Sequence, residues 1–510
     1  MKKHKLNVFG MSKRLKDKLM KNKVFIITII AWVVATLFRM FNHIPWLDEA
    51  HAWTIAQDLS LVEIIKLMKI EGHTLIWYLM LMPFAKMDWG YPYVMQILNW
   101  VFCFGAIILL WKKAPFNNLV KVLITFSFPF FTVYPIIARC YSIGIFLLFL
   151  LTILFKDKLK YPIIYSILLV LCANTSVMAL FGATAFGILF LYDFIKEKQD
   201  LKNLIIPLII FVLGGGLILY LLVGSDATAI TDYKGFSIFK EDVVLWYFIP
   251  TILCIIASIF LMRKSPKALF FLGFTYLALT YCSIFKYYGH YWNHYFYYIY
   301  LILVIWLGME KEKSSKPLMI VLAIISLLNI SSYGTINENT KNISLKGMSD
   351  IMIKEIISDS NFENKTIILD DIDSIGFKLL PYSKTKNINE ISYCSGKGYD
   401  SNIKDFPPEN VWCHFKDEDT LIQNNSSKRI SSLMENKDAF LILYFKQGIY
   451  PEWLREVLKE NSNLVAKVAT FKDGKVQGNS FTWDNLKLTP YKCFSYEKTQ
   501  VKCIWYVEKN

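Results

Sequence analysis

A succession of long apolar runs separated by short basic loops is the feature that most constrains this chain. Of its 510 residues, 55% are hydrophobic. Several runs approach the roughly 20 residues that a helix needs to cross a bilayer. Eleven such segments follow one another: 24–41, 91–111, 119–137, 141–155, 161–173, 176–194, 203–223, 244–262, 268–285, 291–308 and 317–333. The sequence therefore predicts an α-helical polytopic membrane protein of the cell membrane.

The basic residues between these segments predict how the chain is oriented. They cluster at five places: 112–113, 156–160, 196–202, 263–267 and 311–316. Because cytoplasmic loops of membrane proteins are enriched in Lys and Arg, these loops and the lysine-rich amino terminus are predicted to lie inside the cell. The net charge of +15 thus reports topology and gives no reason to expect nucleic acid as a partner.

The composition changes after Tyr333, where Asn, Lys, Asp and Ser become frequent. Periodicity there predicts two helices and three strands: helices at 345–357 and 451–460, strands at 366–369, 439–445 and 464–471. We therefore predict a cytoplasmic tail at 1–23, a transmembrane domain at 24–333 with its first outer loop at 42–90, and a small extracytoplasmic α/β domain at 334–510.

Four of the nine cysteines belong to the predicted outer domain: Cys394, Cys413, Cys493 and Cys503. An even number of cysteines outside the cell permits disulfides without requiring them.

Two adjacent acids, Asp48 and Glu49, follow the first predicted span. Ionisable groups at a membrane edge are costly, and they are often functional. A carboxylate there can take a proton from a hydroxyl as a general base, or it can hold a divalent cation such as Mg²⁺ or Mn²⁺. A wet interfacial loop, with Trp46 and Trp53 as headgroup anchors, accounts equally well for this stretch. Because neighbouring residues point in different directions, we expect only one acid to face a reacting centre.

Further unusual residues fall on the same predicted outer side: His73, Arg139, Tyr141, Lys286 and His294. A guanidinium suits a phosphate, which it grips through paired hydrogen bonds, although an arginine that reaches to lipid headgroups is the alternative. An aromatic cluster with a lysine, as in 286–295, is also normal at an interface.

Two smaller patterns lie between the predicted spans. Ser60 and Glu63 form a capping-box pattern before apolar residues at helical spacing, which predicts a helix lying in the interface. The polar break Asn174-Thr175-Ser176 reads as a tight turn, and we assign it no role.

Four short motifs share the predicted outer face. They are Asp48-Glu49, Glu71-Gly72-His73 running into Leu75-Ile76-Trp77-Tyr78-Leu79, Ala138-Arg139-Cys140-Tyr141, and the cluster from Gly289 to His294. In this order they resemble the GT-C class of integral-membrane glycosyltransferases, in particular the bacterial branch related to protein mannosyltransferases and aminoarabinose transferases. The resemblance covers about residues 20–333.

The resemblance implies a glycosyltransferase that moves a sugar from a polyprenyl-phosphate donor to an extracytoplasmic glycan, lipid or protein, with inversion at the anomeric carbon. It implies that Asp48 acts as base or metal ligand, with Glu49 beside it, and that Arg139 contacts the donor phosphate. It extends substrate binding to four more residues: His73, Tyr141, Lys286 and His294. The chain departs from the family at Asn293, where relatives often carry Arg before His, and at Thr74, where they often carry Pro.

A polytopic transporter or a lipid or polysaccharide flippase is the competing class, because it also needs polar residues within the membrane. Transporters bind cargo near mid-membrane and often contain inverted repeats. Here the unusual residues gather on one face and no repeat is evident, which favours the enzyme. A third class, an envelope scaffold or polysaccharide polymerase without this donor chemistry, would be favoured if Asp48 proved dispensable.

The predicted topology has a direct test. A cysteine introduced near Asn361 should react with a membrane-impermeant reagent in intact cells, whereas one near Lys198 should react only after the membrane is opened. The unmodified chain gives the background from native cysteines. The opposite pattern would place Asp48 in the cytoplasm and contradict the outer site as well.

Overall fold

A computed structural model describes the following parts of the chain: 13–223, 252, 255–260, 262–263, 265–286, 291–309, 316–331, 348–369, 379, 381–382, 390–393, 439–446, 469–472, 475–478, 480–483, 486–496 and 500–509. The chain divides into two compact units. The first comprises Met1–Asn42, Ile65–Trp77 and Gln96–Glu338. The second comprises His43–Ile64, Tyr78–Met95 and Asn339–Asn510.

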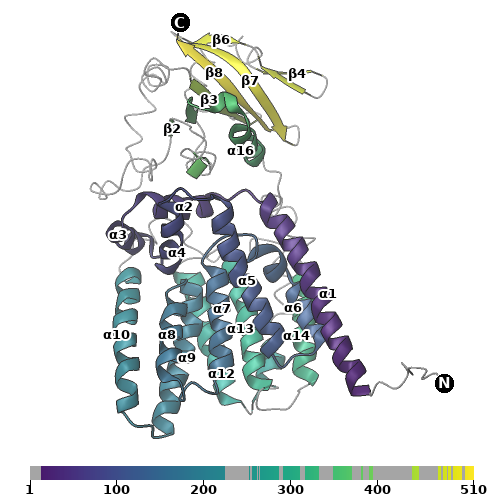
Figure 1. Cartoon of the computed structure of the whole chain (residues 1–510), viewed down its shortest axis with the longest axis vertical. Coiled ribbons are helices and arrows are strands. Elements are labelled where there is room, and N and C mark those ends of the chain that lie inside the picture. Colours follow the sequence, from purple (N-terminus) through teal and green to yellow (C-terminus); the bar gives the residue numbers. More distant parts are fainter. Residues whose placement is uncertain are drawn as a thin grey trace, which may run out of the picture. The chain divides into compact units, whose positions relative to one another are not determined.

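The first unit is helical. Its helices are α1 (Lys13–Asn42), most of α5 (Tyr93–Lys113), α6 (Asn118–Thr125), α7 (Tyr141–Leu154), α8 (Pro162–Ala173), α9 (Val177–Lys196), α10 (Lys202–Leu222), α12 (Pro266–Phe285), α13 (Tyr291–Met309) and α14 (Lys316–Ser331). Helices α7 to α10, α12 and α13 pack side by side (Figure 1). By length and composition, five helices can cross a membrane: Lys23–Asn42, Tyr93–Lys113, Val177–Lys196, Lys202–Leu222 and Pro266–Phe285. The described chain is thus mostly helical, with several helices suited to a bilayer.

These five helices coincide with five of the predicted segments. Helix α13 covers the segment predicted at 291–308, and α7, α8 and α14 are apolar helices too short to be counted among the five. Most of 244–262 lies outside the described residues. The count of eleven spans therefore stays a prediction.

The segment predicted at 119–137 is not one continuous helix. Helix α6 ends at Thr125, and a π-helical turn, η2 (Pro129–Val133), follows it. Pro129 has no N–H with which to continue the hydrogen bonding of α6, and it stands in the opening turn of η2, where a missing donor costs least. The segment is apolar throughout, so hydropathy alone does not reveal the break.

Side chains of α1 donate hydrogen bonds to a carbonyl and a hydroxyl of this irregular turn. Trp32 Nε1 donates to the Phe130 carbonyl at 2.9 Å, and Arg39 Nη1 donates to Thr132 Oγ1 at 3.0 Å. The Trp32 ring also stacks on Trp100, with centroids 5.6 Å apart. Buried backbone that lies outside a regular helix needs such partners, so α1 fixes η2 through specific donors as well as apolar contact.

A buried carboxylate joins three helical segments at the other predicted face. Asp193 in α9 lies 2.7 Å from Lys158 Nζ, in the turn after α7, and 2.5 Å from Lys267 Nζ at the start of α12. Asp193 and Lys158 are 1% and 5% exposed, so both charges depend on the pairing. Burial has the larger effect on Lys158 and lowers the pKa of this lysine, although Asp193 favours its charged form.

The second unit contains a six-stranded mixed sheet in the order β2-β1-β3-β8-β7-β6. Its strands are β1 (Thr366–Leu369), β2 (Glu390–Tyr393), β3 (Ala439–Lys446), β6 (Phe481–Trp483), β7 (Leu486–Tyr496) and β8 (Gln500–Lys509). Strand β1 is parallel to β2 and β3, and the remaining pairs are antiparallel. A separate hairpin consists of β4 (Ala469–Lys472) and β5 (Lys475–Gly478).

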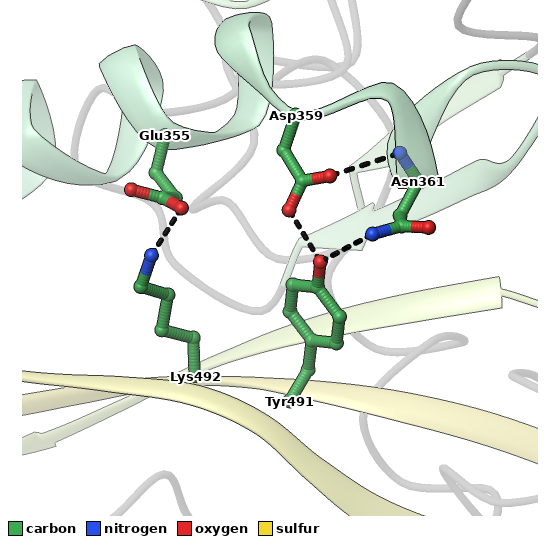
Figure 2. A network of polar contacts seen from close by, with 5 residues as sticks. All are labelled: Glu355, Asp359, Asn361, Tyr491 and Lys492. Atoms are coloured by element: carbon green, nitrogen blue, oxygen red, sulfur yellow. Dashed lines mark hydrogen bonds and ion pairs between the residues drawn. The ribbon is translucent and has the colours of Figure 1, made fainter.

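Helix α16 (Met348–Ser358) packs on this sheet through β7. The register of β7 shifts between Pro490 and Lys492, which makes Tyr491 the extra residue of a bulge. As a result two consecutive residues of β7 reach α16 and the residue that directly follows it. Lys492 pairs with Glu355, and the Tyr491 hydroxyl donates to Asp359 (Figure 2). This hydrogen bond lowers the pKa of Asp359.

Several elements predicted for the carboxyl-terminal region are confirmed: α16, β1 and β3 lie where periodicity placed them. Of the strand predicted at 464–471, residues 469–471 belong to β4, whereas 464–468 and the helix predicted at 451–460 lie outside the described residues. Cys493 stands opposite Cys503 in the register of β7 and β8. Cys394 and Cys413 also lie outside the described part of the chain.

We predict that Asp193→Asn lowers the apparent melting temperature of the detergent-solubilised protein, because breaking a buried ion pair costs about 3–5 kcal/mol. Replacing all three residues together, as Lys158→Met, Asp193→Leu and Lys267→Met, should recover most of the loss, since no charge then remains unpaired. Asp157→Asn changes an exposed carboxylate of the same turn, so it should shift stability by no more than about 0.5 kcal/mol. Equal melting of Asp193→Asn and wild type would contradict the role of this cluster.

Candidate functional site

The two acids after the first span have different surroundings. They lie in the first turn of α2 (Leu47–Asp58), in the second unit. Glu49 is fully buried, and its Oε2 accepts hydrogen bonds from His43 Nε2 and from the Trp46 backbone N–H, both at 2.7 Å. His43 is itself 8% exposed. The Glu49 carboxylate thus ties the start of α2 to His43 and Trp46 in the connection before it.

The local sequence explains why α2 begins here. Trp46 occupies the N-cap position in an extended conformation, and Glu49 at the third helical position reaches back to its N–H. This is one half of a capping box, and acidic side chains in a first turn also face the positive end of the helix dipole. The backbone N–H groups of Glu49 and Ala50 both donate to the Trp46 carbonyl at 3.0 Å, which completes the turn.

Asp48 is half-buried, whereas Glu49 has no exposed surface. Consecutive helical residues point about 100° apart, so a turn that directs Glu49 inward directs Asp48 elsewhere. The structure therefore gives the two carboxylates separate environments, and only Asp48 is accessible to solvent.

An aromatic group lies beside Glu49. The Trp53 and Tyr91 rings are 5.2 Å apart, and Tyr382 from the carboxyl-terminal region meets Tyr91 edge-on at 4.8 Å. Burial raises the pKa of Tyr91 well above its ordinary value, and Tyr382 and the Glu49 charge raise it further, so this phenol keeps its proton. Among the described residues, Trp53 Nε1 and the Tyr91 hydroxyl are buried without a hydrogen-bond partner. Such donors are costly to leave unpaired, and an oxygen of water or of a ligand would satisfy them.

His73 is exposed in the turn between α3 (Leu61–Glu71) and α4 (Ile76–Ala85). Helix α3 ends because Gly72 adopts φ +65°, which a residue without Cβ tolerates, and the His73 N–H then closes onto the Met68 carbonyl at 3.1 Å. The following helix is held from far away in the sequence. Asn174 Oδ1 accepts a hydrogen bond from the Leu75 N–H at 3.0 Å. The Asn174 carbonyl accepts one from the Ile76 N–H at 3.4 Å.

Asn174 thus has a function that sequence reasoning did not assign. It stands in the turn between α8 and α9, 8% exposed, and it caps α4 in place of a local N-cap residue. Its contact positions the turn that carries His73.

Two of the predicted outer clusters come together in the first unit. The Tyr134 hydroxyl donates to the Trp292 carbonyl at 2.9 Å, and Asn293 Nδ2 donates to the Tyr141 hydroxyl at 3.1 Å. These bonds join the loop before α7 to the first turn of α13. Half-buried Arg139 and His294 lie on these two joined segments. Asn293, one of the two residues at which the chain departs from the pattern it resembles, is the one that makes the contact with Tyr141.

The remaining predicted residue of this group, Lys286, is exposed at the carboxyl-terminal end of α12. Arg39, in the last turn of α1, is a further arginine near the predicted outer ends of the spans. Sequence reasoning passed over it, and its donors go to η2.

Within the described ranges, no group of three or more His, Cys, Asp or Glu side chains is arranged to hold a metal ion. Glu49 Oε2 faces His43 and the Trp46 N–H, so it does not share a cation with Asp48 through that oxygen. A cation at Asp48 stays a prediction, and the mechanism below takes no step through one.

Comparison with protein-family models, with curated proteins and with solved structures finds no match to this chain. The resemblance to GT-C glycosyltransferases therefore rests on the motifs themselves.

Three residues of this region were not found from sequence: His43, Asn174 and Tyr382. His43 had a local signal, because a histidine at the end of the first span stands six residues before an acid. Asn174 and Tyr382 had none, since their partners Leu75 and Tyr91 are far away in the chain.

The cap supplied by Asn174 leads to a prediction. Asn174→Ala should accelerate amide exchange at residues 72–78 and lower stability by about 1 kcal/mol, the usual effect of losing a helix cap. Asn117→Ala is the matched control, because Asn117 Oδ1 caps α6 by accepting from the Val120 N–H at 2.9 Å. The control should lower stability comparably while exchange at 72–78 stays unchanged. Identical exchange of this segment in both variants would remove the positioning role.

Proposed function

We propose that this protein is a membrane glycosyltransferase that moves a sugar from a polyprenyl-phosphate donor to an extracytoplasmic glycan, lipid or protein acceptor. The observation that carries the proposal is the first turn of α2, which follows a candidate membrane span. There a half-buried Asp48 stands next to a buried Glu49 that anchors the turn. An acid fixed in this way at a membrane edge is suited to general-base chemistry on a hydroxyl.

Asp48 is assigned the chemical step, because an acceptor hydroxyl can reach a carboxylate that is exposed to solvent. Glu49 serves by holding the turn, since its Oε2 already accepts two hydrogen bonds. This division of labour explains why two adjacent acids are useful where only one can face the reacting centre. His73 is exposed, so a substrate can reach it.

Arg139 is assigned to the donor phosphate. It lies two residues before Tyr141, whose hydroxyl accepts a hydrogen bond from Asn293 in α13, and its own N–H donates to the Ile137 carbonyl. The backbone before and after Arg139 is thus held in place. A guanidinium presents paired donors to phosphate oxygens and keeps its charge at every physiological pH. His294 and Lys286, at the start of α13 and the end of α12, complete the predicted binding group.

The reaction is a single displacement. The acceptor oxygen attacks the anomeric carbon as its proton passes to Asp48, and the bond from that carbon to the phosphate oxygen breaks. The electron pair leaves with the polyprenyl phosphate, whose developing charge Arg139 stabilises. One displacement inverts the anomeric centre. The Tyr91 phenol, protonated beside Glu49, offers a donor to a sugar or water oxygen.

The purified full-length protein should hydrolyse or transfer the sugar of a polyprenyl-phosphate sugar when tested with a panel of such lipids. It should not use nucleotide sugars. Turnover with a nucleotide sugar alone would contradict the proposal. Movement of the intact lipid-linked sugar between leaflets of a vesicle, without cleavage, would establish the flippase instead.

The two ends of the displacement are separable by mutation. Asp48→Asn should lower the single-turnover rate by about 10²- to 10⁴-fold and leave donor affinity unchanged, as expected for loss of a general base. Arg139→Ala should weaken donor binding by roughly 10- to 100-fold, because hydrogen bonds to a charged group contribute about 1.5–3 kcal/mol. Arg139→Lys should not restore it.

Matched controls are Asp58→Asn, at the other end of α2, and Arg263→Ala, on the predicted cytoplasmic side. Both should behave as wild type. If Asp48→Asn keeps its turnover, or Arg139→Ala binds donor normally, the corresponding role is wrong.

A further inference from the structure

The side chain that holds Glu49 has no part in the reaction described above, yet the turn that carries Asp48 depends on it. His43 Nε2 lies 2.7 Å from Glu49 Oε2, and the two side chains are 5% and 0% exposed. A buried carboxylate is stable only when hydrogen-bonded donors replace the water it has lost. Besides the Trp46 N–H, His43 is the side-chain donor identified on this oxygen.

The hydrogen bond between His43 and Glu49 also bears on the direction in which the Asp48 side chain points. Glu49 is the third residue of α2 and Asp48 the second, so the two share one helical turn. Pinning Glu49 to His43 prevents rotation of that turn about the helix axis, which would swing Asp48 away from any fixed acceptor. Only Ile44 and Pro45 lie between His43 and Trp46, and the proline ring restricts this short connection.

We propose that His43 is a positioning residue that acts through Glu49 to set the direction of the Asp48 carboxylate. The expected effect of His43 on turnover rests on the proposed function. Its expected effect on the structure of the α2 turn does not. His43 touches neither donor nor acceptor in this scheme. Its effect is therefore on rate at saturating substrate and not on donor affinity.

A pair of amide variants tests this role in the full-length, detergent-solubilised protein. In Gln, Nε2 is separated from Cα by as many bonds as Nε2 of His, so His43→Gln can still donate to Glu49 Oε2. His43→Asn offers the same chemistry on a side chain one bond shorter, which cannot reach. The two variants differ in reach alone.

His43→Asn should speed amide exchange of Glu49 and Ala50, the donors of the first turn, by about tenfold or more. It should also lower the single-turnover rate by about 10²-fold while donor affinity stays within twofold, the scale of loss expected from a misplaced catalytic group. His43→Gln should remain close to wild type in both measurements. If the Asn variant is not recovered folded, His43→Met, which has no donor, takes its place.

Glu63→Ala is the matched control. Glu63 Oε2 accepts from the Ser60 N–H at 2.7 Å, the same capping contact on the next helix, α3, at an exposed site. It should speed exchange in the first turn of α3 and leave α2 and turnover unchanged.

The outcomes are distinct. Wild-type exchange and rate in His43→Asn would overturn the positioning role. Equal losses in the Gln and Asn variants would overturn it as well, because they would show that the imidazole itself takes part in proton transfer. If the wild-type protein transfers no lipid-linked sugar, the proposed function fails, and amide exchange alone decides whether His43 fixes this turn.

Discussion

The requirement that most buried polar groups be hydrogen-bonded is the constraint on which this structure depends. Apolar surface alone would let the helices of the first unit slide and rotate against one another, because hydrophobic contact has no direction. Specific donors remove that freedom. Trp32 and Arg39 satisfy the carbonyl and hydroxyl groups of η2, and Asn174 caps α4 from a turn about one hundred residues away.

The same requirement separates the two acids of the proposed site. Burial of Glu49 is tolerated because His43 and the Trp46 N–H replace its water, and this anchoring leaves the adjacent Asp48 half-exposed in a fixed turn. A catalytic group on a rigid element keeps its geometry without spending substrate binding energy on ordering it. In the proposed mechanism, a buried acid thus contributes to chemistry through the position of its neighbour.

The carboxyl-terminal region contributes to this neighbourhood as well. Tyr382 contacts Tyr91 within the second unit, and the polar network between α16 and β7 gives its sheet a fixed partner helix (Figure 2). The bulge at Tyr491 is essential to that network, because regular alternation would send Tyr491 and Lys492 to opposite faces. A region that follows the apolar helices in sequence therefore supplies a side chain that contacts Tyr91, in the loop before α5.

The sequence by itself determined the elements whose signal is local: long apolar helices such as α9 and α10, the strands β1 and β3, and the acids at the start of α2. Hydropathy and periodicity depend on neighbours within a few residues, and these patterns are read directly. The break at Pro129, the capping by Asn174, the pairing of Asp193 with two lysines and the contact of Tyr382 were decided only by tertiary structure. Each of these depends on which distant backbone or charge comes within hydrogen-bonding reach, and no local pattern contains that information.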